Sequence, residues 1–176
     1  MIKVSRSAVE LSLKCMRCFV LQYKHKLKPF SLPFTLNIAV DNLAKNEFDH
    51  YRDKEEPHPL FVENGIDAIP FKHPDMDRWR NFRQGGLFYK NKEKGYHFWG
   101  AVDDIWKKPN DELIVSDVKA TAKNIFDWQD TWDKYDYPKA YRRQLEMYQW
   151  LLRKNGFQVS DKGYLVYYNG QKNNSM

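Results

Sequence analysis

The sequence contains little cysteine and no long run of apolar residues. Two cysteines among 176 residues are too few for the disulfide framework of a secreted domain, so we expect a reducing, cytoplasmic compartment. No stretch approaches the ~18 uninterrupted apolar residues that a membrane-spanning helix needs. Lys14 and Arg17 interrupt the apolar stretch near the start, so no secretory leader is expected. These absences predict a cytoplasmic protein without a membrane partner.

Internal repeats, low-complexity tracts and Gly/Ser-rich linkers are also missing. Apolar side chains nevertheless make up 42% of the chain and aromatic ones 16%, which is enough to bury a sizeable core and argues against disorder. The length fits one domain, and we predict a single domain over residues 1–176.

The net charge of +6 is concentrated at one end of the chain. Residues 1–30 contain seven basic residues and one acidic residue, so the remaining chain is balanced. Such a cluster indicates either contacts with a polyanion or a solvated basic helix face, and on charge alone we prefer the second interpretation. The candidates for nucleic-acid contacts are Arg17, Lys24, Lys26 and Lys28.

The pattern of apolar residues, proline and glycine predicts an α/β fold with a central mixed β-sheet flanked by helices. Residues 53–84 carry four prolines, so irregular, mostly extended chain is expected there. The predicted helices cover residues 6–27, 36–52 and 138–155. The predicted strands cover residues 87–90, 96–106, 112–121 and 163–169.

Two aspartates come together if the strands on either side of Pro109 form a hairpin centred on Asn110. Asp103 then lies opposite Asp117, whereas Asp104 points to the other face of the sheet. Opposed carboxylates repel each other and need a compensating cation. A divalent ion such as Mg²⁺ or Mn²⁺ suits oxygen ligands, and Lys119 adds a third charged group on the same face.

The alternative is a solvent-exposed hairpin that carries scattered charges. The residues flanking the two aspartates on that face are apolar, namely Ala101, Ile105 and Val115. Burying carboxylates among such neighbours is costly unless a cation pairs with them. We therefore prefer the metal-site interpretation.

Four motifs, taken together, resemble the PD-(D/E)XK nuclease superfamily, and more narrowly its RecB-like branch, which includes nuclease domains of recombination helicases. Three of them are Gly100-Ala-Val-Asp103, Asp117-Val-Lys119 after an apolar strand, and Gln144-x-x-x-Tyr148 on the next helix. The fourth is the N-terminal pattern Ser7-x-x-x-Leu11-x-x-x-Cys15-x-Arg17-x-Phe19-x-x-x-Tyr23. The motifs run from about residue 7 to residue 168, which is nearly the whole chain.

The resemblance implies metal-dependent hydrolysis of DNA phosphodiester bonds. In it, Asp103, Asp117 and the Val118 carbonyl would hold Mg²⁺ or Mn²⁺, and Lys119 would orient or activate the attacking water. Gln144 and Tyr148, one helical turn apart, would face the site and the bound strand. Ordinary helix packing is the alternative for these last two residues.

The sequence departs from the branch in two respects. A metal-associated His on an early helix is absent or shifted; Asp41 is our candidate substitute, and a solvated charged stripe with Lys45 and Asp49 is the alternative. Some relatives bind an iron–sulfur cluster through four cysteines, but Cys15 and Cys18 are the only ones here, so no cluster is expected. We expect both thiols to pack in the core.

Two other functions compete with a nuclease. A catalytically degenerate module could bind nucleic acid or a protein partner; the intact Asp103, Asp117 and Lys119 argue against it, and the missing His argues for it. A small-molecule enzyme with a carboxylate metal site is the other, and the basic N-terminal segment and surplus aromatic residues argue against it.

Overall fold

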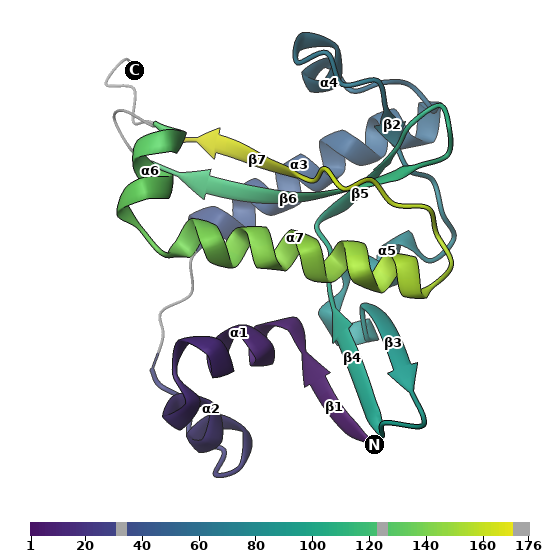
Figure 1. Ribbon diagram of the computed structural model, residues 1–176. Helices are drawn as coiled ribbons and strands as arrows, with labels where there is room; N and C mark the ends of the chain where they lie inside the picture. Colours follow the sequence, from purple (N-terminus) through teal and green to yellow (C-terminus); the bar gives the residue numbers. More distant parts are fainter. Residues whose placement is uncertain (31–34, 123–126, 171–176) are drawn as a thin grey trace.

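A four-stranded mixed sheet forms the centre of the protein (Figure 1). The computed structural model describes residues 1–30, 35–122 and 127–170. In this sheet β6 pairs antiparallel with β5 and parallel with β7, which confirms the predicted α/β class with a mixed sheet. The strand order is β2 (Ile69–Pro70), β5 (Asp104–Lys107), β6 (Leu113–Thr121) and β7 (Tyr164–Asn169).

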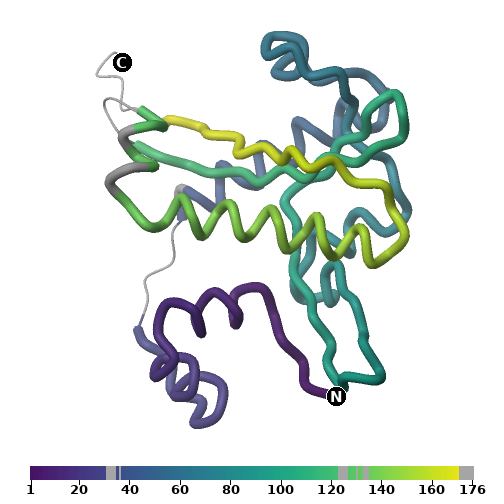
Figure 2. Tube along the Cα trace, viewed as in Figure 1, coloured from purple at the N-terminus to yellow at the C-terminus, as the bar shows by residue number. Residues whose placement is uncertain are grey.

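Two long helices cover the faces of this sheet. The residues of β5 and β6 alternate between them: Ile105 and Val115 pack with α7 (Tyr137–Lys154), whereas Trp106 and Ile114 pack with α3 (Thr35–Lys54). Each side therefore has its own apolar core. The chain trace in Figure 2 shows α3 and α7 running along β6.

A second, three-stranded sheet was not predicted. It has the order β1 (Ile2–Ser5), β4 (Tyr96–Gly100) and β3 (Leu87–Asn91). The single strand predicted over residues 96–106 is therefore wrong: the chain leaves β4 at Gly100 and enters the other sheet as β5. Gly100, at the end of β4, is closely packed, because a Cβ there would lie 2.6 Å from the Tyr148 ring. Gly86, at φ +62°, likewise leaves no room for a side chain beside the Gly100 carbonyl oxygen, which would lie 2.3 Å from a Cβ.

The helix predicted over residues 6–27 is divided into α1 (Arg6–Lys14) and α2 (Met16–Tyr23). Cys15 is extended (φ −159°) and caps α2, since its sulfur accepts a hydrogen bond from the Cys18 N–H at 3.2 Å. The predicted core packing of the two thiols is also wrong. Cys18 is exposed and Cys15 is only partly buried, with the two sulfurs 2.7 Å apart.

Residues 53–84 contain short helices where extended chain was expected. These are α4 (Pro59–Glu63), α5 (Met76–Arg80) and a 3-10 turn (Phe82–Gln84). Pro59 begins a helix instead of breaking one, because the first helical position needs no N–H, and the His58 side chain caps that helix through Leu60 N. A further helix, α6 (Trp128–Lys134), precedes α7. In the described parts of the chain, every helix is too short or too polar to cross a bilayer.

Candidate active site

Asp117 lies in the middle of β6 and Lys119 two residues closer to its carboxyl end, both on the face covered by α7. The Asp117 carboxylate is fully buried, and its Oδ2 forms an ion pair with the Lys119 ammonium group. The other oxygen accepts a hydrogen bond from Gln144 Nε2 at 2.5 Å. Gln144 of α7 therefore orients the Asp117 carboxylate, while Lys119 balances its charge.

Asp103 lies one residue before β5, where the chain has just crossed from the other sheet. The hairpin has the predicted register, with Asp104 opposite Ser116, so Asp103 lies just outside the ladder. Its Oδ2 accepts a hydrogen bond from the Val118 N–H at 2.9 Å, which holds the carboxylate beside β6. Burial, together with the charge of Asp117, raises the pKa of Asp103 to about 7.

Helix α3 adds a lysine and a carboxylate to this group. Lys45 Nζ lies 2.7 Å from Asp41 Oδ2 and 4.0 Å from Asp103 Oδ1, so it bridges the two acids. Asp41 Oδ1 is buried and has no hydrogen-bond partner among the described residues. Asp49, four residues beyond Lys45 on the same helix, instead pairs with Arg52 and Arg80.

A cavity of about 400 Å³ opens between α3, the end of β6 and α7. Its lining includes Asp41, Asp103, Val118, Lys119 and Tyr141. The Tyr141 ring covers the Lys119 ammonium group, with 4.5 Å from the ring centroid to Nζ. The cavity therefore brings together carboxylate, carbonyl and ammonium groups from three segments of the chain, namely α3, the residue before β5, and the end of β6.

Sequence reasoning missed Lys45 and Tyr141 as members of this group. Lys45 was visible only as part of a charged helix stripe, and nothing in the sequence shows that Asp103 approaches it. Tyr141 had a signal, since it precedes Gln144 by three residues and so shares its helix face.

Tyr148 lies apart from the cavity. Its ring is buried against Gly100 and lines a smaller hollow of about 190 Å³ that also includes Arg6. Burial raises the pKa of the Tyr148 hydroxyl to about 12, with Asp103 and Asp117 adding to the rise and Arg6 opposing it.

The basic candidates lie elsewhere on the surface. Arg17 is exposed on α2, and Lys24, Lys26 and Lys28 are exposed in the segment that follows it. In Figure 1 this region lies below α7, whereas β6 and β7 lie above it. The described residues lining the 400 Å³ cavity include none of the four.

Asp104 lies on the opposite face, as expected. It is fully buried there and forms an ion pair with Arg52 of α3. Arg52 also donates to the Phe71 carbonyl oxygen at 3.0 Å, so the pair ties α3 to β5 and to the chain that leads into α5.

The donors around Asp103 suit a hard cation. Over residues 1–30, 35–122 and 127–170, no three His, Cys, Asp or Glu side chains gather in a group that could hold a metal ion. Two carboxylates and the Val118 carbonyl do converge, however, and Asp117 Oδ2 is buried with no hydrogen bond from the described residues besides its ion pair with Lys119. These are oxygen ligands of the kind that Mg²⁺ and Mn²⁺ prefer.

Residues 36–175 match the family model of the PD-(D/E)XK nuclease superfamily. The matched region includes the segment around Asp103 that connects the two sheets, together with the whole of β6 and of α7. It leaves out α1 and α2. The chain belongs to the PD-(D/E)XK nuclease superfamily. Members are generally nucleases that bind nucleic acid and typically use divalent metal ions. A comparison with curated proteins finds no match.

The raised pKa of Asp103 has a measurable effect on stability. The pKa is about 7 in the folded chain and ~3.9 when unfolded, so ionising Asp103 destabilises the metal-free fold increasingly as the pH rises between these values. Asp103→Asn removes this charge, and we expect a higher melting temperature at pH 8, by ~2–4 °C for each kcal/mol gained.

Thermal melts in chelator at pH 5 and pH 8 measure this effect. The gain is expected to be smaller at pH 5, where the wild-type carboxyl group is largely protonated. Asp111→Asn, at an exposed residue of the same hairpin, serves as the matched control. Equal gains at the two pH values would contradict the proposed charge effect.

Proposed function

We propose that this chain is a metal-dependent nuclease of the RecB-like branch that hydrolyses DNA phosphodiester bonds. The observation that carries the proposal is that Asp103 and Lys119 line one cavity while Lys119 pairs with the buried Asp117 carboxylate, in a chain of the PD-(D/E)XK superfamily. The family membership supports a nuclease, and the motif around Ser7 to Tyr23 supports the narrower branch.

In this proposal, Asp103, Asp117 and the Val118 carbonyl hold Mg²⁺ or Mn²⁺, and Asp41 contributes from α3. When bound, such an ion would supply a water of lowered pKa and would offset charge that develops on the phosphate. Lys119 positions the attacking water against the phosphate. Gln144 fixes the direction of the Asp117 carboxylate through its 2.5 Å hydrogen bond, and Tyr141 limits the freedom of Lys119 by covering it.

The positive charges already present fit the same scheme. Two carboxylates held close together repel each other, and Lys45 and Lys119 offset that repulsion in the metal-free chain. A bound dication would take over this role and free the Lys119 ammonium group for water and phosphate.

A degenerate nucleic-acid-binding module is the second candidate. Two observations favour it: the described residues contain no three-residue metal group, and Asp41, the candidate substitute for the early-helix His, pairs with Lys45. Both candidates predict DNA binding, and only the first predicts turnover.

Incubation with labelled DNA distinguishes them. Linear and circular, single- and double-stranded substrates are incubated with Mg²⁺, with Mn²⁺ and with chelator. The nuclease proposal expects metal-dependent products from the wild type and none in chelator. Wild-type protein that binds DNA but yields no product with either metal would favour the degenerate module.

The basic segment after α2 is proposed to capture DNA. Each Lys that neutralises a phosphate releases counterions and contributes a slope of about −0.9 in log K against log salt for duplex DNA. Reversing Lys24, Lys26 and Lys28 to Glu is therefore expected to weaken binding of all sequences and to flatten the salt dependence. Cleavage at saturating substrate is expected to change little.

Filter binding or fluorescence anisotropy over a salt series measures this effect. Reversal of Lys90, Lys92 and Lys94 is a matched control, because these lysines are also exposed and lie in and around the β3–β4 hairpin. An unchanged affinity and salt slope in the first variant would show that its charge only solvates the surface. An equal loss in the control would show that any surface charge has the same effect.

A further inference from the structure

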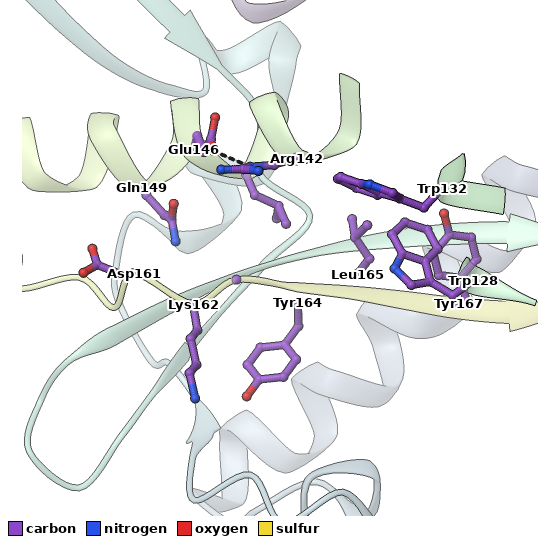
Figure 3. Close-up of a pocket in the computed structure, with 12 residues that line it drawn as sticks. Trp128, Trp132, Arg142, Glu146, Gln149, Asp161, Lys162, Tyr164, Leu165 and Tyr167 are labelled. Atoms are coloured by element: carbon purple, nitrogen blue, oxygen red, sulfur yellow. Dashed lines mark hydrogen bonds and ion pairs between the residues drawn. The ribbon is translucent and has the colours of Figure 1, made fainter. Parts of the chain in front are cut away.

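A second pocket lies along the outer edge of the central sheet, between β7, α6 and the exposed side of α7 (Figure 3). Its volume is about 730 Å³, in the range of sites that bind small molecules and nucleotides. None of its described lining residues belongs to the metal-binding group proposed above.

Aromatic rings gather at one end of this pocket. Trp128 and Trp132 of α6 have ring centroids 5.7 Å apart, and Tyr167 of β7 lies 5.4 Å from Trp128. Figure 3 shows the three rings clustered beside Leu165. All three are only partly buried, so part of their surface remains open to a ligand. Flat, apolar surfaces of this kind stack against nucleobases of any sequence.

The acidic side chains in the lining do not make the pocket anionic. Glu146 accepts a hydrogen bond from Arg142 at 2.8 Å, and Asp161 accepts one from Arg153 at 2.7 Å. Lys162 is exposed at the same rim and adds a positive charge. A nucleic-acid backbone can therefore approach without meeting an uncompensated carboxylate.

The aromatic end adjoins the candidate active site. Tyr167 and Lys119 are register partners on the parallel strands β7 and β6, which lie about 4.8 Å apart, so both side chains project from neighbouring strands to the α7 face. A chain whose phosphate contacts Lys119 would place a neighbouring base beside Tyr167 and Trp128. A base inside a duplex is already stacked on both faces, and cannot use such a platform.

We propose that the pocket formed by Trp128, Trp132 and Tyr167 is a base-binding subsite for an unstacked nucleobase of a single strand, next to the phosphate held at Lys119. This inference rests on the proposed nuclease function for its position relative to the cut. It assigns single-stranded or frayed DNA as the substrate class.

Binding measured in chelator tests the subsite without requiring cleavage. Two labelled probes are compared. One is an oligothymidylate of about 12 nucleotides, a length within the site sizes of single-strand-binding grooves, and the other is a blunt duplex of the same length. Trp128→Leu and Trp132→Leu are each expected to raise the Kd for the single strand about 5- to 150-fold, with the duplex Kd changed less than about twofold.

Two further variants control for folding and for loss of any tryptophan. Trp150→Leu changes a tryptophan that packs against Tyr89 and Phe98, away from the pocket, and should leave both Kd values unchanged. Trp132→Phe retains a ring and should recover most of the single-strand affinity. Thermal melts verify that each variant is folded.

The outcomes separate this inference from the proposed function. A selective loss of single-strand affinity supports the subsite, even if the wild type cleaves nothing, in which case only the nuclease proposal fails. Unchanged single-strand affinity in both Trp→Leu variants, or an equal loss for the duplex, overturns the subsite whether or not the protein is a nuclease.

Discussion

Asp117→Asn and Lys119→Ala are each expected to abolish DNA cleavage, lowering the single-turnover rate by ~10²–10⁴-fold or more. Asp117 is fully buried, and Asn keeps its shape while removing the negative charge that would hold the ion. Lys119→Ala removes the ammonium group that is paired with Asp117 and covered by Tyr141. DNA affinity is expected to fall much less than the rate, because both groups act on the transition state.

Single-turnover kinetics with saturating enzyme, together with anisotropy in chelator, separate the two effects. Lys107→Ala and Asp111→Asn are the matched controls: these residues form an ion pair with each other at 3.2 Å near the hairpin turn, away from the cavity. Calorimetric titration with Mn²⁺ gives a readout apart from activity, and Asp117→Asn should lose the binding heat. Variants that cleave at the wild-type rate would remove these residues from the catalytic centre.

The face of the sheet that carries the site could be predicted because two local signals agree. The turn at Pro109 to Asp111 sets the register of the hairpin, and strict alternation then assigns every side chain of β5 and β6 to a face. That is why Asp104 and Asp117 lie on opposite faces in the structure as they do in the sequence interpretation.

The remaining features depend on contacts between residues far apart in sequence. Gly100, the last residue of β4, packs against Tyr148, and a strand pattern in residues 96–106 carries no information about a ring from α7. Lys45 approaches Asp103 only because α3 packs against the central sheet, which sequence spacing does not show. Cys15 could not be recognised as a cap from the sequence, because the apolar spacing of the helix continues through it. Its extended backbone, which interrupts the helix, is visible only in the structure.

Arg52→Leu is expected to be among the most destabilising single substitutions in the protein. Arg52 and Asp104 form an ion pair in which the side chains are 6% and 1% exposed, so the substitution leaves a buried carboxylate without its ion-pair partner, with only the longer-range charge of Arg80 to offset it. Removing one partner of such a pair typically costs ~3–5 kcal/mol. At ~2–4 °C per kcal/mol, the melting temperature should fall by roughly 6–20 °C.

The pH dependence identifies the cause of this loss. Burial raises the pKa of Asp104, and Arg52 opposes that rise, so the pKa should climb further without the guanidinium group. A raised pKa in the folded state means that stability is retained at low pH and is lost as the pH rises through that pKa. The deficit of Arg52→Leu is therefore expected to be smaller at pH 5 than at pH 8.

A second substitution tests the same cause from the other side of the pair. Asp104→Asn in the Arg52→Leu background removes the stranded charge, retains an acceptor for the Ile105 N–H, and should recover part of the lost stability at pH 8. Arg78→Leu is the matched control, because Arg78 pairs with Asp75 at a partly exposed position and should shift the melting temperature little. If Asp104→Asn recovers nothing, the loss in Arg52→Leu comes from packing and from the Phe71 hydrogen bond rather than from the buried carboxyl group.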